Sequence, residues 1–416
     1  MAAKVTAMNR MLLAAALVST TLSLDTSAQW PQWRGPVRDG SVPKGAVPET
    51  WPDDLRITWT RAVGEGYSSP VVEGGRVHVH SREGDDEVVT ALDLVTGSPV
   101  WTDRYRSAFS KNKYANSMSR GPFSTPLVAG GRLFTLGSSA VLTAYDAVSG
   151  NVLWRRDWSG DVDTSRLFTG TAMSPLLDGG LLIVHVGDDR NGAFRAVDPA
   201  TGAERWALPG HGPGYASPIV ASFGGTRQLV TLTDRAAVGV AVGDGRELWQ
   251  IPFPDEWNEN IVTPVVAGDI LVISGTRQGT FGYRIEKSET GFAPRRIWHN
   301  ADLPMYMSSP VVVEHALFGF SNRRKGQLFC LDVATGAARW TTDGRAGANA
   351  SLQKAGEAIL ALTTEGDLLV LRASAEKYDE IRRYKIPNGE TWAQPVLLGD
   401  RLLVRHGNSV SVWALQ

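Results

Sequence analysis

Hydrophobic residues along this chain come in short alternating or β-branched runs, and a glycine-containing turn follows many of them. The segment SSPVVEGGRVHVH, residues 68–80, shows the pattern: a Ser-Pro-Val run, a Gly-Gly turn and a second run in which Val and His alternate. A period of two places every second side chain on one face of a β-strand, whereas a helix needs a period near 3.6. Because no long run of strong helix formers follows residue 24, the pattern predicts an all-β protein.

A second repeated unit carries an acid, a glycine and a tryptophan at fixed offsets. Its clear copies are ALDLVTGSPVW (91–101), AYDAVSGNVLW (144–154), AVDPATGAERW (196–206) and CLDVATGAARW (330–340). The aspartate can accept hydrogen bonds from N–H groups of the turn, and the glycine can take the positive φ that the turn requires. Alternation along the strand then places the indole on a sheet face, where it can pack against the next repeat. We therefore interpret these residues as structural blade residues: Asp93, Gly97, Trp101, Asp146, Gly150, Trp154, Asp198, Gly202, Trp206, Asp332, Gly336 and Trp340.

The repeat length predicts a propeller. Tryptophans of successive copies, including weaker copies that end at Trp249 and Trp298, lie 42 to 53 residues apart, and each interval holds four short strands. Such spacing is typical of a β-propeller blade. Eight Ser-Pro-type strands begin blades, but the last blade has no tryptophan strand, whereas RITWTRA (56–62) is a tryptophan strand with nothing before it. We expect this N-terminal strand to close the ring as the fourth strand of the eighth blade.

The first 28 residues have the features of a secretory signal peptide. Lys4 and Arg10 precede an apolar stretch at 11–24, and small residues at 26–28 suit cleavage before Gln29. The apolar stretch is too short to span a bilayer of about 30 Å as a helix. We expect a signal peptide at 1–28, a leader at 29–56 and an eight-bladed propeller at 57–416. No cysteine lies near the cleavage point, so we expect an exported, soluble, monomeric periplasmic or extracellular protein without a lipid anchor there.

Charge and cysteine content narrow the function. The formal net charge is -1, with 42 Lys plus Arg against 43 Asp plus Glu, so no global field attracts nucleic acid or a membrane surface. The single cysteine, Cys330, stands where sister repeats have Ala91, Ala144 and Ala196. We interpret it as a core residue. His78 and His80 alternate on one strand without an evident third ligand, so a zinc site is not expected.

The two repeated units, x-SPVV-x-GGRV and A-x-D-x-x-TG-x-x-x-W, resemble the pyrroloquinoline-quinone-type (PQQ) propeller repeat across residues 57–416. The fold is similar to that of the periplasmic barrel-assembly lipoprotein BamB and to the core of quinoprotein alcohol dehydrogenases. The dehydrogenase resemblance implies PQQ with calcium, a catalytic aspartate, a tryptophan floor and usually an adjacent cysteine pair. We can match no calcium ligand, catalytic aspartate or cysteine pair, and so predict no catalytic, cofactor-binding or metal-binding residue. A PQQ-dependent or other periplasmic oxidoreductase remains the alternative.

The candidate site residues lie on one face of the propeller. The links between second and third strands, and those between one blade and the next, are long and differ in sequence from blade to blade. Such loops commonly carry binding residues. At the mouth of the channel we expect aromatic residues, and on the loops basic ones: Tyr67, Phe123, Tyr215 and Trp392, with Arg82, Arg190, Arg277, Arg323, Arg324 and Lys325. Tyr, Trp and Arg dominate the energetics of protein interfaces. The sequence thus favours a non-enzymatic scaffold that presents this face to a protein, a peptide or an envelope polymer. The other interpretation is that the aromatics pack between blades and the charges are merely solvated.

Overall fold

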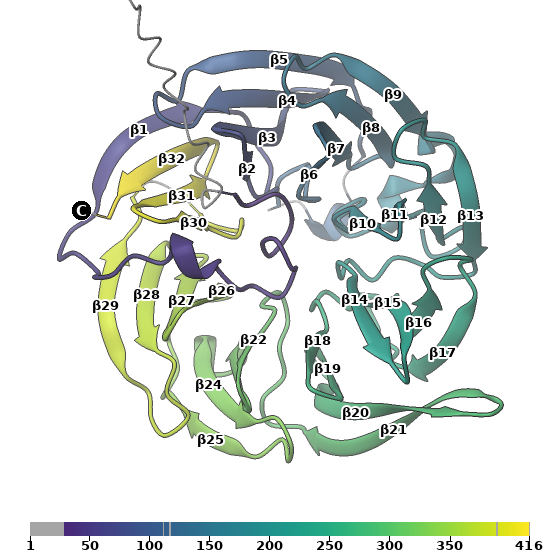
Figure 1. Cartoon of the computed structure of the whole chain (residues 1–416), viewed down its shortest axis with the longest axis vertical. Helices are drawn as coiled ribbons and strands as arrows, with labels where there is room; N and C mark the ends of the chain where they lie inside the picture. Colours follow the sequence, from purple (N-terminus) through teal and green to yellow (C-terminus); the bar gives the residue numbers. More distant parts are fainter. Residues whose placement is uncertain (1–28, 111, 116–117, 388–389, 416) are drawn as a thin grey trace, which may run out of the picture.

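Eight four-stranded antiparallel sheets surround a central axis in the computed structural model, which describes residues 29–110, 112–115, 118–387 and 390–415 (Figure 1). Each sheet is one blade, and its first strand lies nearest the axis (Figure 1). The predicted all-β, eight-bladed architecture is therefore confirmed. The expected signal peptide at 1–28 lies outside the described residues.

The first four blades follow the chain in order. Their strands are β2–β5 (Val71–Glu73, Arg76–Glu83, Asp86–Asp93, Pro99–Arg106), β6–β9 (Leu127–Ala129, Arg132–Leu136, Val141–Asp146, Val152–Asp157), β10–β13 (Leu176–Asp178, Leu181–Val186, Ala193–Val197, Glu204–Pro209) and β14–β17 (Ile219–Phe223, Thr226–Leu232, Ala236–Ala241, Glu247–Pro252).

The next three blades repeat this order, and the eighth combines both ends of the chain. Their strands are β18–β21 (Val265–Ala267, Ile270–Gly275, Gly279–Ser288, Gly291–Asn300), β22–β25 (Val311–Val313, Ala316–Ser321, Gln327–Asp332, Ala338–Thr341), β26–β29 (Ala350–Ala355, Ala358–Thr363, Asp367–Arg372, Glu380–Lys385) and β30–β32 (Val396–Leu398, Arg401–His406, Ser409–Ala414) with β1 (Arg56–Ala62).

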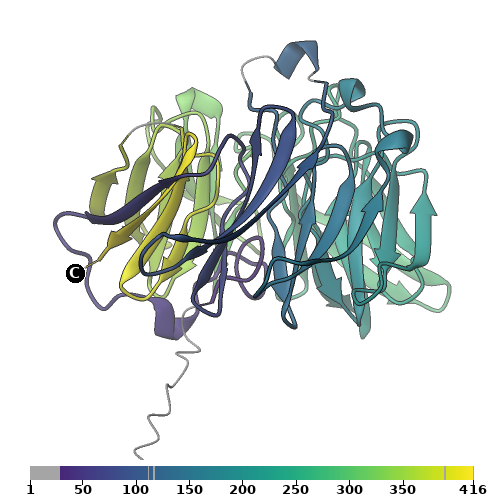
Figure 2. The same ribbon diagram turned by 90° about the horizontal axis from the view of Figure 1, so that it is seen from above.

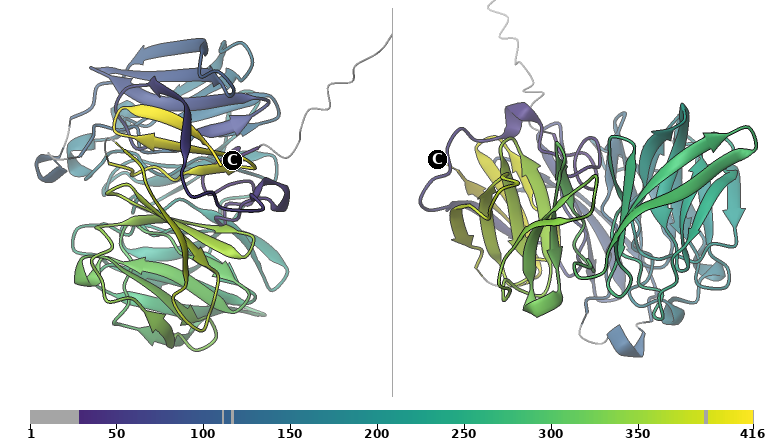
Figure 3. Two further views of the ribbon diagram at one scale, coloured as in Figure 1. Left: turned by 90° about the vertical axis from the view of Figure 1, so that its left-hand side faces the viewer. Right: turned by 90° about the horizontal axis from the view of Figure 1, so that it is seen from below.

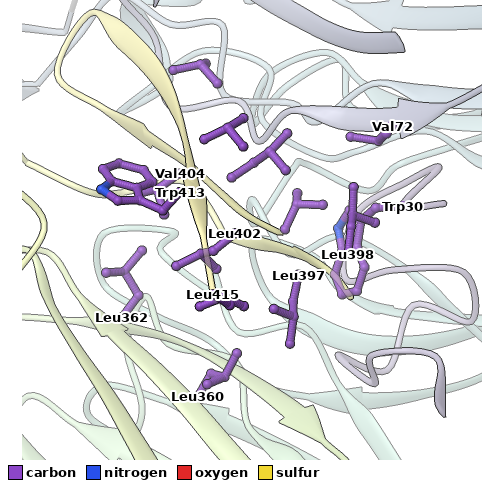
Figure 4. Packing of buried hydrophobic residues seen from close by; sticks show 14 of the residues in the cluster. Trp30, Val72, Leu360, Leu362, Leu397, Leu398, Leu402, Val404, Trp413 and Leu415 are labelled. Carbon is purple, nitrogen blue, oxygen red and sulfur yellow. The ribbon is translucent and has the colours of Figure 1, made fainter. Parts of the chain in front are cut away.

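The ring closes through β1, as the sequence predicts. This strand pairs antiparallel with β32, from Arg56 opposite Ala414 to Ala62 opposite Ser409. The closing blade shares one buried hydrophobic cluster with its neighbours, which includes Trp30, Val72, Leu398 and Trp413 (Figure 4). Closure leaves no gap in the ring and buries apolar residues from both ends of the chain in one core.

The repeat tryptophans lie at the seams between blades. The Trp101 ring packs on Gly150 in the turn of the next blade, and its Nε1–H donates to the Ala147 carbonyl oxygen at 3.2 Å. The same packing on a glycine recurs for Trp59 on Gly97, Trp154 on Gly202, Trp206 on Gly245 and Trp298 on Gly336. Trp340 donates to the Ser374 carbonyl at 2.9 Å instead. Trp249, from a weaker copy, bonds within its own blade to Gln228 Oε1 at 2.6 Å.

The repeat aspartates organise the turns that receive these rings. Asp93 Oδ1 accepts from the backbone N–H of Val95 at 3.1 Å, and from the N–H and hydroxyl of Thr96 at 2.8 and 2.9 Å. Gly97 completes the turn at φ 68°. Asp146 makes the same three bonds in the next blade. The acid therefore fixes the turn, and the turn presents its glycine to the indole of the preceding blade.

The disc has two distinct faces. We call the loop face the one formed by the links from second to third strands and between blades, and the turn face the opposite one. Short 3-10 helices lie on the loop face: η2 (Lys113–Ala115), η3 (Ser159–Asp161), η4 (Thr164–Arg166) and η5 (Arg323–Lys325). The leader with η1 (Lys44–Ala46) lies on the turn face (Figures 2 and 3). The two faces therefore differ in what covers the central channel.

Candidate binding face and its central hollow

A hollow of about 140 Å3 lies at the centre of the loop face. It is lined by residues that precede the first strands of seven blades. These are Tyr67, Phe123, Ala172, Tyr215, Ile261, Met307 and Trp392. The eighth equivalent, Asn349, borders a neighbouring hollow. All four aromatic residues singled out from the sequence are thus brought together at the mouth of the channel.

Three of these rings pack on one another. Tyr67 stacks on Trp392 with centroids 5.4 Å apart, and meets Phe123 edge-on at 5.7 Å. The N–H of Ser119 donates to the Tyr67 hydroxyl oxygen at 3.3 Å, and burial raises the pKa of that hydroxyl. All three rings are half-buried, so they pack between blades and also face the hollow. The two interpretations of these residues are therefore compatible.

Tyr215 has an unusual backbone. Its φ is 75°, in the left-handed region that bulky residues rarely adopt. Its hydroxyl oxygen accepts from the Phe168 N–H at 2.7 Å, and the Ala216 N–H donates to the Asn260 carbonyl at 3.2 Å. These contacts hold the ring at the wall of the hollow against a backbone preference of about 1 kcal/mol or more.

The floor of the hollow comes from the leader, which crosses the centre of the ring (Figure 1) on its turn-face side (Figures 2 and 3). Trp33 lines the hollow, and its Nε1–H donates to the Thr263 hydroxyl oxygen at 3.2 Å. The leader thus makes the loop-face opening a blind hollow.

Two buried arginines fix the leader. Arg34 donates to the carbonyls of Ser309 and Pro310, and Arg38 to those of Ser174, Pro175 and Pro218. Burial lowers the pKa of Arg34 to about 10 and that of Arg38 to about 9, so both stay charged at neutral pH. Neither forms an ion pair within the described ranges, and backbone carbonyls satisfy most of their N–H groups. The role of these residues in the leader gave no local signal in the sequence.

The channel hydroxyls are used in bonds between blades. In five blades a backbone N–H donates to a hydroxyl oxygen of the next blade, at 2.8 to 3.2 Å. The donor and acceptor pairs are Ser69 to Thr125, Thr125 to Ser174, Ser174 to Ser217, Thr263 to Ser309 and Gln394 to Ser69. Each hydroxyl accepts from the preceding blade, so together they tie first strands around the axis. Their chemistry here is structural.

Arg82 is a correction to the sequence-based set. We expected it on an exposed loop, but it is only 1 % exposed. Its guanidinium donates to Glu87 Oε1 at 2.9 Å and to the Ser107 carbonyl at 2.8 Å. Burial alone would raise the pKa of Glu87, but hydrogen bonds from His80 and Tyr105 and the charges of His80 and Arg82 outweigh it and lower that pKa to about 2. The acid five residues along the hairpin is the signal that could have marked Arg82 as an internal residue.

The remaining basic residues of the set are exposed on the loop face. Arg277 pairs with Glu256 at 2.7 Å and lies 5.8 Å over the Trp257 ring. Arg190 has an exposed side chain in the β11–β12 link. Arg323, Arg324 and Lys325 form η5.

Sequence reasoning missed an exposed aromatic pair on the same face. Trp257 is 52 % exposed and Tyr114 is 66 % exposed, and their rings meet edge-on at 6.2 Å. Both border a further hollow that also includes Phe168 and Tyr306. Because Phe168 lines the central hollow as well, the two hollows adjoin. The two residues lie 143 positions apart in the sequence, so only the folded ring reveals the pair. The tryptophan in the PFPDEWNENI loop was the available hint.

The residues present do not fit a PQQ cofactor. An apolar cavity of about 150 Å3 holds one benzene ring, whereas PQQ is a tricyclic tricarboxylate. Among the described residues, no charged side chain lines the central hollow. Within the described ranges, no three His, Cys, Asp or Glu side chains gather where they could share a metal ion. We therefore derive no chemistry through a quinone.

The fold and site define a closed eight-bladed β-propeller with one plugged and one open channel end. The sequence profile of the family described as outer membrane protein assembly factor BamB matches residues 51–119 and 107–342. The chain belongs to this family.

Individual relatives are distant. The chain is 25 % identical over 370 residues to outer membrane protein assembly factor BamB of Burkholderia pseudomallei, covering 84 % of this chain and 85 % of the relative. It is 27 % identical over 235 residues to that of Yersinia pestis, covering 51 % of this chain and 54 % of the relative, so this match spans about half of each protein.

Solved structures share the fold. BamB from Moraxella catarrhalis has a TM-score of 0.60 at 16 % identity, covering 86 % of this chain and 99 % of that one. Quinohemoprotein alcohol dehydrogenase from Comamonas testosteroni has a TM-score of 0.64 at 12 % identity, covering 95 % and 81 %. At these identities the likeness concerns the fold alone.

Proposed function

We propose that this protein is an exported, monomeric, non-enzymatic scaffold whose loop face binds a segment of a partner protein. The observation that carries the proposal is the blind central hollow, which is lined by aromatic and small residues and floored by Trp33. A hollow of this size accepts one large apolar side chain, the kind of anchor that dominates protein interfaces. A protein segment is favoured over an envelope polymer because the lining residues that the structure describes are uncharged and include several aromatic and two methionine side chains.

The exposed pair Tyr114 and Trp257 supports the same face. Aromatic side chains and arginine are enriched at protein interfaces. Truncating one buried tryptophan there can cost about 2 kcal/mol or more of binding free energy. Lys113 lies 4.8 Å from the Tyr114 ring centroid, which adds a second cation to the pair. The candidate residues from the sequence are part of this proposal: Tyr67, Phe123, Tyr215, Trp392, Arg190, Arg277, Arg323, Arg324 and Lys325.

The family agrees with a binding role. The curated relatives are named outer membrane protein assembly factors, and we extend to this chain the role of an assembly factor that contacts other proteins of the cell envelope. In the described part of the chain, no helix has the length and apolar character needed to cross a bilayer. Export rests on the segment 1–28.

The test compares the two faces. We expect Tyr114→Ala with Trp257→Ala to weaken retention of an envelope partner by at least about tenfold in a quantitative pull-down. The matched control is Val95→Ala with Val148→Ala, because these turn-face side chains are 61 % and 63 % exposed. Equal losses for both pairs, or a loss only for the control pair, would argue against the loop face.

A further inference from the structure

Four cations gather at one edge of the loop face. Arg323, Arg324 and Lys325 lie in the β23–β24 link, Arg345 lies in the β25–β26 link, and all four are exposed. We call these four residues the basic shelf. In the described ranges none of them forms an ion pair, whereas Arg277 on the same face pairs with Glu256 at 2.7 Å. The shelf therefore carries charge that the chain itself does not neutralise.

The backbone holds the shelf in a strained, well-defined shape. Arg324, Lys325 and Arg345 have φ values of 52°, 63° and 66°. N–H groups of one link donate to carbonyls of the other: Arg345 to Arg324 at 3.0 Å, Ala346 to Gly326 at 3.0 Å and Gly347 to Lys325 at 3.2 Å. Left-handed conformations at non-glycine residues are unfavourable and persist where surrounding contacts enforce them. The four cations therefore lie on two loops that are joined by backbone hydrogen bonds.

Acidic neighbours leave the shelf with excess positive charge. Glu365 borders the same hollow as Lys325 and Arg345, but its carboxylate accepts from the Ala348 N–H at 2.8 Å and the Thr364 hydroxyl at 3.1 Å. Asp343 is exposed in the β25–β26 link. Glu365 and Asp343 offset two of the four cations, so these loops carry more positive than negative side chains, in a chain whose formal net charge is -1.

The shelf adjoins the apolar part of the loop face. Tyr306 borders both the shelf hollow and the hollow that contains Trp257. The next residue, Met307, lines the central hollow. A chain lying across the face would therefore meet cations at one end and aromatic rings at the other.

We propose that the loop face recognises an extended acidic protein segment, whose carboxylates contact the basic shelf while an apolar or aromatic side chain enters the central hollow. This inference rests on the proposed protein-binding function. A protein segment is favoured over an anionic membrane because the charge lies beside a blind hollow that fits a single side chain. Arginine also matches carboxylates through paired N–H donors.

The experiment selects random phage-displayed peptides on the immobilised full chain. Peptides of about ten residues reach about 33 Å when extended, enough to cross several blades. We expect the selected peptides to have an excess of Asp and Glu around a Phe, Tyr, Trp or Leu. A selection without acidic excess, or without any enriched peptide, overturns the inference.

Variants separate the shelf from the rest of the face. Arg323→Glu with Lys325→Glu should weaken a selected synthetic peptide about tenfold or more, because attraction becomes repulsion. Arg246→Glu, at a turn-face cation whose side chain is 70 % exposed, is the matched control and should leave the affinity unchanged. If the peptide binds the shelf variant and the wild type with equal affinity, the basic shelf does not contact the peptide and the inference is wrong.

Two further outcomes distinguish the inference from the function on which it rests. If Trp257→Ala abolishes peptide binding but the shelf variant does not, the loop face binds protein and only the acidic specificity is wrong. If neither change affects binding, both proposals fail. Shelf-dependent binding to phosphatidylglycerol vesicles, with no acidic peptide selected, would instead assign the shelf to a lipid surface and overturn the inference.

Discussion

At the scale of single residues, the seams between blades depend on which glycine a tryptophan covers. Gly131 and Gly150 both have positive φ, 74° and 78°, so a side chain at either position strains the backbone. They differ in their surroundings. A Cβ at Gly150 would lie 2.5 Å from Trp101 Cδ2, whereas a Cβ at Gly131 would meet nothing within 4 Å. The two positions therefore separate backbone strain from loss of the seam.

We predict that Gly150→Ala lowers the free energy of unfolding by about 3 kcal/mol, because strain and displacement of the indole add. Gly131→Ala should cost only about 1 kcal/mol, from strain alone. Urea unfolding followed by tryptophan fluorescence measures both. Similar losses for the two variants would mean that the indole adapts and that the seam is not the source of stability.

At the scale of elements, the leader is the hub of the ring. Its segment from Trp30 to Ala46 makes a hydrogen bond with every blade, through Val72, Val128, Pro175, Pro218, Thr263, Pro310, Lys354 and Gly399. Strands β2 and β26 each both donate to the leader and accept from it. Trp30 and Val72 exchange two backbone hydrogen bonds, and Lys354 donates to the Gly40 carbonyl and accepts from the Val42 N–H. The leader thus belongs to the propeller and closes the turn-face end of the channel.

Arg38 should be the critical contact of that element. We predict that Arg38→Ala costs about 2 kcal/mol or more, because three buried carbonyls lose their donor and the buried side chain leaves a void. Arg246→Ala, at a side chain 70 % exposed, should change stability by no more than about 0.5 kcal/mol. Thermal unfolding of both variants beside the wild type measures these changes. If the Arg38→Ala protein is as stable as the wild type, the leader does not hold the blades together through Arg38.

At the scale of the whole molecule, the sequence predicted what is local and repeated. Blade number, strand order and closure through β1 follow from motifs that recur within single blades, so periodicity was sufficient. The leader could not be placed, because Trp33 meets Thr263 across 230 positions and no repeat encodes that contact. Arg82 was misplaced since its partner Glu87 neutralises it inside the fold. The adjacency of Tyr114 to Trp257 likewise depends on the closed ring.

The two faces of the whole molecule differ in structure. The leader covers the channel on the turn face, and the loop face keeps an open aromatic hollow with cations at one edge. Outer strands also carry exposed apolar side chains, such as Val100 at 47 % exposure on β5. We propose that a partner protein contacts the loop face rather than the turn face or the outer wall.

Site-specific photocrosslinking in the producing cell can identify the face that the partner contacts. A photoreactive phenylalanine analogue is placed singly at Tyr114 on the loop face, at Val148 on the turn face and at Val100 on the outer wall. We expect a discrete protein adduct from position 114 and none from positions 148 and 100. An adduct from position 148 or 100 with none from position 114 would contradict it.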